Sequence, residues 1–145
     1  MSDPIEVHSA VVHPWHHDQF GHMNVRHYAP MFDDAAFHAW SRFGLPLSGL
    51  LAEHGVHTVA GRTTTNYVKE LVAGDLVRIS AAITRIGTKS ADLKLWMRHA
   101  ETGETHATFE IVEVFFDPKT RTSAPIPESV REILKRAPLV APDSG

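Results

Sequence analysis

Residues 28–43 carry the pattern that most limits how this chain can fold. Apolar side chains recur there at every third or fourth position, which is the spacing of one broad helical face. They are Tyr28, Met31, Phe32, Ala35, Ala36, Ala39, Trp40 and Phe43. Pro30 is tolerated in the first turn of such a helix, and Gly44 with Pro46 ends it. Because no other stretch has a helical pattern of this length, one helix must cover any sheet that the remaining chain forms.

Most of the remaining chain alternates apolar and polar residues, which is typical of β-strands. We expect one strand before the helix, at residues 5–12, and four long strands at 57–68, 77–83, 91–98 and 105–116. Strands of about 12 residues reach roughly 40 Å and favour a large antiparallel sheet. The sequence therefore predicts an α+β fold in which a long antiparallel β-sheet wraps around one central α-helix.

The last part of the chain adds a short amphipathic helix. Pro127 stands at its start, and Val130, Ile133 and Leu134 share one face. Residues 138–145 are expected to form a loose tail. Since we find no internal repeat or linker, and 145 residues is the usual size of one domain, we expect a single domain over residues 1–145.

The composition excludes several functional classes. The chain has no cysteine, which rules out disulfides, a thiolate nucleophile and Cys-ligated metal sites. The 14 basic and 17 acidic residues give no surplus of positive charge for nucleic acid. The N-terminus lacks the pattern of a signal peptide, and no apolar run is long enough to cross a membrane. We therefore expect a cytoplasmic protein with no nucleic-acid or membrane partner.

The loop before the long helix is the candidate functional site. It places Asp18 a few residues ahead of a helix N-terminus, where unpaired N–H groups and a partial positive charge face outward. Such a terminus can polarise a carbonyl oxygen, and a nearby carboxylate can act as general base or nucleophile. Gly21 permits the close approach and unusual backbone that this turn requires. Asn24 is expected to cap the helix.

This loop resembles a known family signature. Residues 18–24, Asp-Gln-Phe-Gly-His-Met-Asn, together with Tyr28, resemble the D-x-x-G-H-[VM]-N-x-x-x-Y motif. That motif belongs to hotdog-fold acyl-CoA thioesterases of the 4-hydroxybenzoyl-CoA thioesterase-like superfamily. Residues 66–71 and the Gly74–Asp75 turn resemble the family's Y-x-x-E-L-x-x-G-D stretch. The resemblance continues through the Thr102–Gly103 hairpin and so covers nearly the whole chain.

The resemblance implies a fold, an activity and a set of site residues. It implies a hotdog fold, with hydrolysis of an acyl-CoA thioester to a carboxylic acid and free CoA. Asp18 matches the catalytic carboxylate, and the Val25 backbone N–H matches the group that polarises the thioester carbonyl. The residues expected to shape the turn or contact the substrate are Gly21, His22, Asn24, Tyr28, Thr64 and Lys69. Active sites would lie between protomers of a homodimer or homotetramer, and coenzyme A would enter as part of the substrate, without a further cofactor.

The sequence allows several alternatives at this site. Many family members have a second Asn where this chain has Val25, so only a backbone contact survives there. Water could attack the thioester with Asp18 as general base, or Asp18 could attack first and form a mixed anhydride. The basic residue that meets the CoA phosphates could be Lys69, Arg78, Arg85 or Lys89. A non-catalytic acyl-CoA-binding hotdog module is the alternative function.

Histidine is unusually frequent near the N-terminus. Of the 11 histidines, six fall in the first 27 residues: His8, His13, His16, His17, His22 and His27. Imidazole and carboxylate together suit zinc or iron, but the spacing matches no recognised metal motif. We therefore expect no metal and interpret the cluster as the surroundings of an acyl-transfer site.

Overall fold

The computed structural model describes residues 2–142, which form one antiparallel sheet beside a long helix. The strand order is β1-β3-β4-β5-β2, with β6 paired to β5. The strands are β1 (Ile5–Val11), β2 (His57–Tyr67), β3 (Leu76–Ile86), β4 (Ser90–His99), β5 (Thr105–Asp117) and β6 (Thr122–Ser123). The five predicted strands are therefore confirmed. The two-residue β6 was not predicted, because it is too short to show a pattern.

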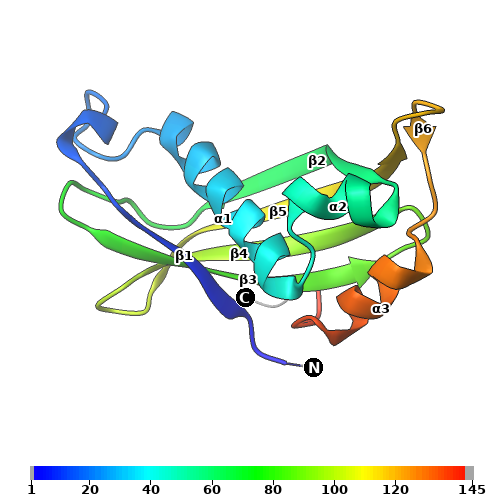
Figure 1. Ribbon diagram of the computed structural model, residues 1–145. Helices are drawn as coiled ribbons and strands as arrows, with labels where there is room; N and C mark the ends of the chain where they lie inside the picture. The colour runs from blue at the N-terminus through cyan, green and yellow to red at the C-terminus, as the bar shows by residue number, and fades with distance from the viewer. Residues whose placement is uncertain (1, 143–145) are drawn as a thin grey trace.

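The long helix α1 (Tyr28–Phe43) lies across the curled sheet, as Figure 1 shows. The residues predicted to form its apolar face are all buried. Phe32 stacks on Phe109 of β5 with ring centroids 4.9 Å apart, and Trp40 meets Phe115 edge-on. Gly44 ends the helix with φ of 100°, a backbone conformation that glycine adopts without strain. The sheet and α1 therefore enclose one hydrophobic core.

Two short helices lie at the other end of the molecule from the N-terminal loop (Figure 1). The helix α3 (Glu128–Arg136) is the predicted amphipathic helix, and it buries Val130 and Leu134. The helix α2 (Leu47–His54) was not predicted. Its eight residues bury only Leu50 fully, so the sequence carries too little periodicity to reveal it.

The prediction of a loose C-terminal tail is wrong for residues 138–140. The Ile83 N–H donates to the Pro138 carbonyl (2.8 Å), and the Val140 N–H donates to the Ile83 carbonyl (2.9 Å). Val140 also packs with Ala82 and Trp96 in a small second cluster. The pairing of β1 with β3 ends at Ala81, so the tail satisfies backbone groups that β1 leaves unpaired. Residues 143–145 of the predicted tail lie outside the described residues.

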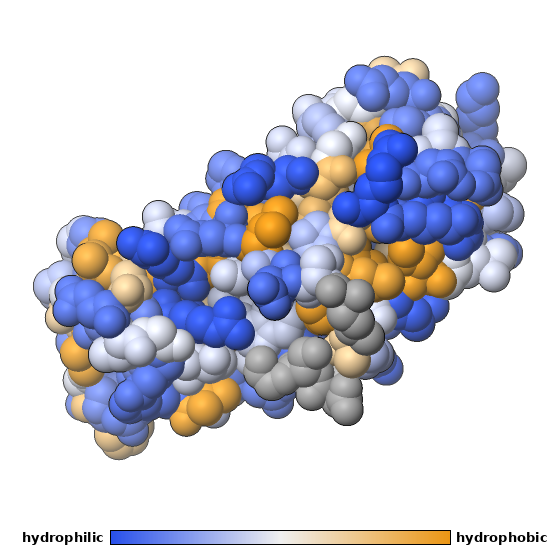
Figure 2. All heavy atoms as spheres, turned by 90° about the horizontal axis from the view of Figure 1, so that it is seen from below, coloured by the Kyte–Doolittle hydropathy of each residue, from blue (hydrophilic) through white to orange (hydrophobic). Residues whose placement is uncertain are grey.

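None of the helices in residues 2–142 combines the length and apolarity needed to cross a membrane. Seen from below, the surface carries hydrophobic residues in separate patches between hydrophilic ones (Figure 2).

Candidate active site

The loop that carries Asp18 is a tight turn leading into the start of the helix. The Asp18 N–H donates to the His22 carbonyl (3.0 Å), and the Gly21 N–H donates to the Asp18 carbonyl (3.1 Å). Gly21 has φ of 81°, which fits its predicted role in the turn. A β-bridge between His17 and Met23 closes the loop. The turn therefore holds Asp18 at a fixed place ahead of the helix.

One oxygen of the Asp18 carboxylate is used within this turn. Asp18 Oδ1 accepts the Phe20 N–H at 2.9 Å, the pattern of an Asx turn. Within residues 2–142, Oδ2 has no hydrogen-bond partner. Asp18 therefore has a structural contact and also keeps one carboxylate oxygen available for chemistry.

The start of the helix provides an unpaired backbone donor. Asn24 Oδ1 accepts the Arg26 N–H at 3.0 Å, which confirms the predicted cap on the 3₁₀ turn at Val25–His27 that runs into α1. The Val25 N–H has no acceptor among the described residues. Val25 also lines a pocket. A carbonyl oxygen placed there would meet a free N–H at the positive end of the helix.

This pocket lies between the helix start and the end of β2, and its volume is about 440 Å³. It is lined by His22, Met23, Val25, Tyr28, Tyr67, Val68, Lys69 and Glu70. Four of the predicted site residues therefore meet there: His22, Val25, Tyr28 and Lys69. Asp18, Gly21 and Asn24 belong to the adjoining loop. Tyr67 and Glu70 were not among the predicted site residues, but they also belong to the pocket wall.

Tyr28 forms the buried floor of the pocket, with 3% of its surface exposed. Its ring meets that of Tyr67 edge-on, with centroids 5.0 Å apart. Burial raises the pKa of Tyr28, and the nearby Tyr67 and Glu70 raise it further. The Tyr28 hydroxyl is therefore neutral near pH 7 and can donate a hydrogen bond.

Two ion pairs stand at the pocket wall. His22 Nε2 lies 3.2 Å from Glu70 Oε2, and Lys69 Nζ lies 2.5 Å from Glu104 Oε2. The hydrogen bond and charge of Lys69 lower the pKa of Glu104. Both pairs are largely exposed to solvent, so they contribute little to stability. Their importance lies in the charged groups that they bring to the pocket.

The structure places Thr64 away from this pocket. A second groove of about 490 Å³ runs between α1 and β2, and it is lined by Thr63 and Thr65 together with Ala29 and Asp33 of α1. Thr64 instead lines a small hollow with Arg62 and Thr84. Successive strand residues point to opposite faces, so Thr63 and Thr65 face the helix where Thr64 does not. The sequence could not assign these faces without the register between β2 and β5.

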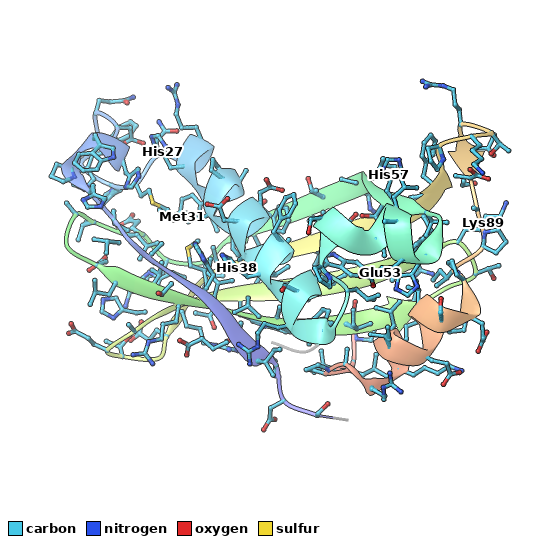
Figure 3. All side chains as sticks on the ribbon, viewed as in Figure 1. His27, Met31, His38, Glu53, His57 and Lys89 are labelled. Carbon is cyan, nitrogen blue, oxygen red and sulfur yellow. The ribbon has the colours of Figure 1, made fainter. Side chains whose placement is uncertain are left out.

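The N-terminal histidines mainly hold the loop in place. The Ala73 N–H donates to His17 Nε2, and the His13 N–H donates to His16 Nδ1, each at 2.8 Å. Burial lowers the pKa of His16, and its histidine neighbours lower it further. Figure 3 shows His27 near this loop, where its ring lies 4.9 Å from that of His16. In residues 2–142 no group of three or more His, Asp or Glu side chains is arranged to hold a metal ion.

Both the sequence and the fold are similar to those of known proteins. A family model described as the thioesterase-like superfamily matches residues 12–134. No curated protein matches the sequence at a significant level. Among solved structures, a hypothetical protein from Staphylococcus aureus in complex with CoA has a TM-score of 0.81 and 23% identity, covering 97% of this chain and 90% of that chain.

Two further solved structures are similar. A 1,4-dihydroxy-2-naphthoyl-CoA thioesterase from Synechocystis has a TM-score of 0.76 and 16% identity, covering 89% of this chain and 94% of that chain. A probable thioesterase from Escherichia coli has a TM-score of 0.76 and 23% identity, covering 88% of this chain and 95% of that chain. These likenesses confirm the predicted hotdog fold.

Proposed function

Because the chain belongs to the thioesterase-like superfamily and is thereby a thioester hydrolase, we propose that it hydrolyses an acyl-CoA to a carboxylic acid and free CoA at the pocket beside Tyr28. The observation that carries this assignment is the unpaired N–H of Val25, a residue that stands at a helix start and lines that pocket. An oxyanion that forms there gains a hydrogen bond and the favourable helix dipole.

Asp18 is the proposed reacting carboxylate. With the carbonyl oxygen on the Val25 N–H, Oδ2 of Asp18 either removes a proton from the attacking water or attacks the acyl carbon itself. The Asx turn supports both routes, because Oδ1 holds the side chain while Oδ2 stays free. Incorporation of heavy oxygen from labelled water into Asp18 during a single turnover would identify the covalent route.

The acyl-CoA assignment is supported by the space around the pocket and by similar proteins. The groove between α1 and β2 adjoins the pocket, since Ala29 follows Tyr28 and Thr65 precedes Tyr67 by two residues. That groove is available to the acyl group, while Lys69 is available to CoA phosphates if it leaves Glu104. The Staphylococcus aureus structure contains CoA, and the Synechocystis protein acts on an acyl-CoA.

The proposed active form is a homodimer or homotetramer in the cytoplasm. Within the described residues β2 pairs only with β5, so its other edge is open. Strands with an open edge readily pair with another chain. Since β2 also supplies Tyr67 and borders the acyl groove, a second protomer on this edge would help to enclose the substrate.

Thiol release from a panel of short-chain, long-chain and aryl acyl-CoA esters tests the proposed function. Asp18→Asn should lower kcat by at least about 100-fold, because it removes the reacting carboxylate but can keep the Asx turn. The matched control is Asp117→Asn, since Asp117 Oδ1 accepts the Lys119 N–H at 2.9 Å in the same kind of turn. Asp117→Asn should hydrolyse the same ester at the wild-type rate.

The same panel of acyl-CoA esters also tests the alternative function. A non-catalytic acyl-CoA-binding module is favoured by one observation, namely that the Asp18 carboxylate already serves its own turn. Tight binding of an acyl-CoA without turnover by the wild-type protein would establish that alternative. Equal rates for the wild type and Asp18→Asn would show that Asp18 is not the reacting group.

A further inference from the structure

The pocket wall holds a histidine–carboxylate pair that the mechanism above does not use. His22 comes from the loop before α1, whereas Glu70 comes from the segment after β2. Their side chains meet with Nε2 and Oε2 3.2 Å apart, and both residues line the pocket with Val25. The two segments therefore bring an acid–base group to the place where the thioester would bind.

The pair is held by contacts outside itself. The Met23 N–H donates to the Leu71 carbonyl (2.8 Å), which ties the two segments directly beside the pair. His106 Nδ1 lies 2.9 Å from the Glu70 carbonyl oxygen and fixes that backbone from the other side. The side chains of His22 and Glu70 are 37% and 73% exposed, so their attraction adds little to stability. Backbone contacts therefore fix the positions of His22 and Glu70, although the contact between their side chains contributes little to the stability of the fold.

The geometry also determines which nitrogen of His22 can act. Glu70 Oε2 lies beside Nε2 and leaves the other ring nitrogen, Nδ1, for a ligand. Nδ1 has no hydrogen-bond partner among residues 2–142. In the imidazolium form both ring nitrogens carry a proton, so the Nδ1–H can donate to a ligand while the Nε2–H faces Glu70.

We propose that His22 is the general acid that protonates the departing CoA sulfur, and that Glu70 is the positioning residue that orients its ring. This inference rests on the proposed thioesterase function. When the C–S bond breaks, its electron pair stays on sulfur and the Nδ1 proton moves to that sulfur. The attacking water supplies the proton that restores the imidazolium, either through Asp18 or directly in the hydrolysis of a mixed anhydride. His22 therefore ends each turnover in the state in which it began.

Changing the leaving group distinguishes proton transfer by His22 from a purely structural role of His22 and Glu70. A nitrophenyl thiolate needs no proton to depart, because its thiol is far more acidic than an alkyl thiol such as CoA. Rates for His22→Gln and Glu70→Gln are compared on a CoA ester and on the nitrophenyl thioester of the same acyl group. With the CoA ester we expect kcat to fall by about 100-fold for His22→Gln and by roughly 10-fold for Glu70→Gln, with little change in KM. With the nitrophenyl thioester both variants should stay within about 3-fold of the wild type.

A matched pair elsewhere in the chain supplies the control. His54 Nε2 lies 3.8 Å from Glu53 Oε2 on α2, and Figure 3 shows Glu53 at the opposite end of the molecule from His27 and the loop. Glu53→Gln should leave both rates unchanged. Thermal unfolding of Glu70→Gln should match that of the wild type, because the pair is exposed.

Three outcomes would overturn the inference. Equal losses on both thioesters would mean that His22 and Glu70 act on binding or folding and not on the leaving group. Wild-type rates for both variants on the CoA ester would exclude them from the reaction while leaving the proposed function intact. A wild-type protein that hydrolyses no acyl-CoA would instead defeat the proposed function, and this inference with it.

Discussion

The strands β2 and β4 belong to the same sheet and have similar lengths, but their surroundings differ sharply. In β4, Leu93 and Leu95 are fully buried, and even Trp96 on the outer face is only 1% exposed. In β2 no residue is fully buried, and Val59 and Tyr67 are 47% and 52% exposed. The difference arises because β4 lies between β3 and β5 beneath α1, whereas β2 forms an edge.

The comparison separates the part of the sheet that holds the fold from the part that builds the site. The residues of β4 fill the core, and its outer face is covered in part by the C-terminal segment through Val140. The residues of β2 instead border the groove beside α1 and lead into the pocket at Tyr67. An exposed strand can accept a substrate or a second protomer because its surface is not already used by the core.

The largest expected effect is the loss of a core side chain from β4. Leu95→Ala should lower the free energy of unfolding by about 2–5 kcal/mol, because it leaves a cavity at a fully buried position. Val59→Ala in β2 should cost less than about 1 kcal/mol. Urea denaturation measures both values. A loss at Val59 as large as that at Leu95 would mean that β2 is covered in solution, and a dependence on protein concentration would identify the cover as a second copy.

The next effect concerns Gly61, the glycine within β2. A Cβ added at Gly61 would lie 2.8 Å from Val114 Cγ2 of β5, at the bulge between Ala60 and Arg62. Gly61→Ala should therefore cost about 1–3 kcal/mol of unfolding free energy. The double variant Gly61→Ala/Val114→Ala should recover part of that loss, because it removes the clash. Additive losses in this double-mutant cycle would contradict the steric explanation.

A smaller, pH-dependent effect concerns β5, the strand that lies between β2 and β4. Glu113 of β5 is opposite Ala60 of β2 and Ala91 of β4, and it is only 7% exposed. Burial raises the pKa of Glu113 and the charge of Asp33 adds to this, while a hydrogen bond with Thr58 opposes it. The neutral Glu113 carboxyl therefore stabilises the folded state. Its contribution to the free energy of unfolding is fully present below the ordinary Glu pKa of about 4.5, and it is lost as pH rises through the higher pKa that Glu113 has in the folded protein.

Glu113→Gln should remove this dependence, because glutamine stays neutral. The variant should gain stability relative to the wild type as pH rises from 4.5 toward neutrality, by a final amount on the order of 1 kcal/mol. Unfolding by urea at several pH values measures the difference. A gap that is constant with pH would show that the Glu113 carboxyl does not titrate in this range.

The smallest effect concerns an ion pair on the outer side of β4. Arg85 of β3 binds Asp92 through two hydrogen bonds, Nε to Oδ2 (2.9 Å) and Nη2 to Oδ1 (2.7 Å). Because the Arg85 side chain is 46% exposed, Arg85→Ala should cost about 0.5 kcal/mol or less. The loss should shrink further in 1 M salt, as expected from screening with a Debye length of about 3 Å. A larger loss that salt does not change would point to packing by the arginine stem.

Much of the site could be predicted because it depends on neighbours along the chain. The spacing of Gly21 and Asn24 after Asp18 predicted a turn and a capped helix start, and both are present. The unpaired Val25 N–H follows from the same helix start. The α1 face was predictable for the same reason, since a period of 3.6 residues is a local property. The catalytic role of Asp18 stays a prediction.

Other features depend on contacts between distant residues. Thr64 was predicted as a site residue in place of Thr63 and Thr65, because the face of an edge strand follows from its register with β5. Glu70 was not predicted as a site residue, because its carboxylate comes beside His22 only when the two distant segments pack together. The pairing of residues 138–140 with Ile83 depends on where the β1–β3 pairing stops, at Ile5 and Ala81, and both β1 and Ile83 are more than 50 residues from the tail in sequence.

The amino-acid sequence alone determined the central helix, the strands that surround it and the loop that carries Asp18, because periodicity, capping and turn chemistry act over a few residues. Only the tertiary structure decided which groups share the pocket, since that depends on how the sheet brings the end of β2 beside the start of α1. Backbone hydrogen bonds such as Met23 to Leu71 fix this placement. Local chemistry therefore specified the elements of this protein, and long-range strand pairing specified its site.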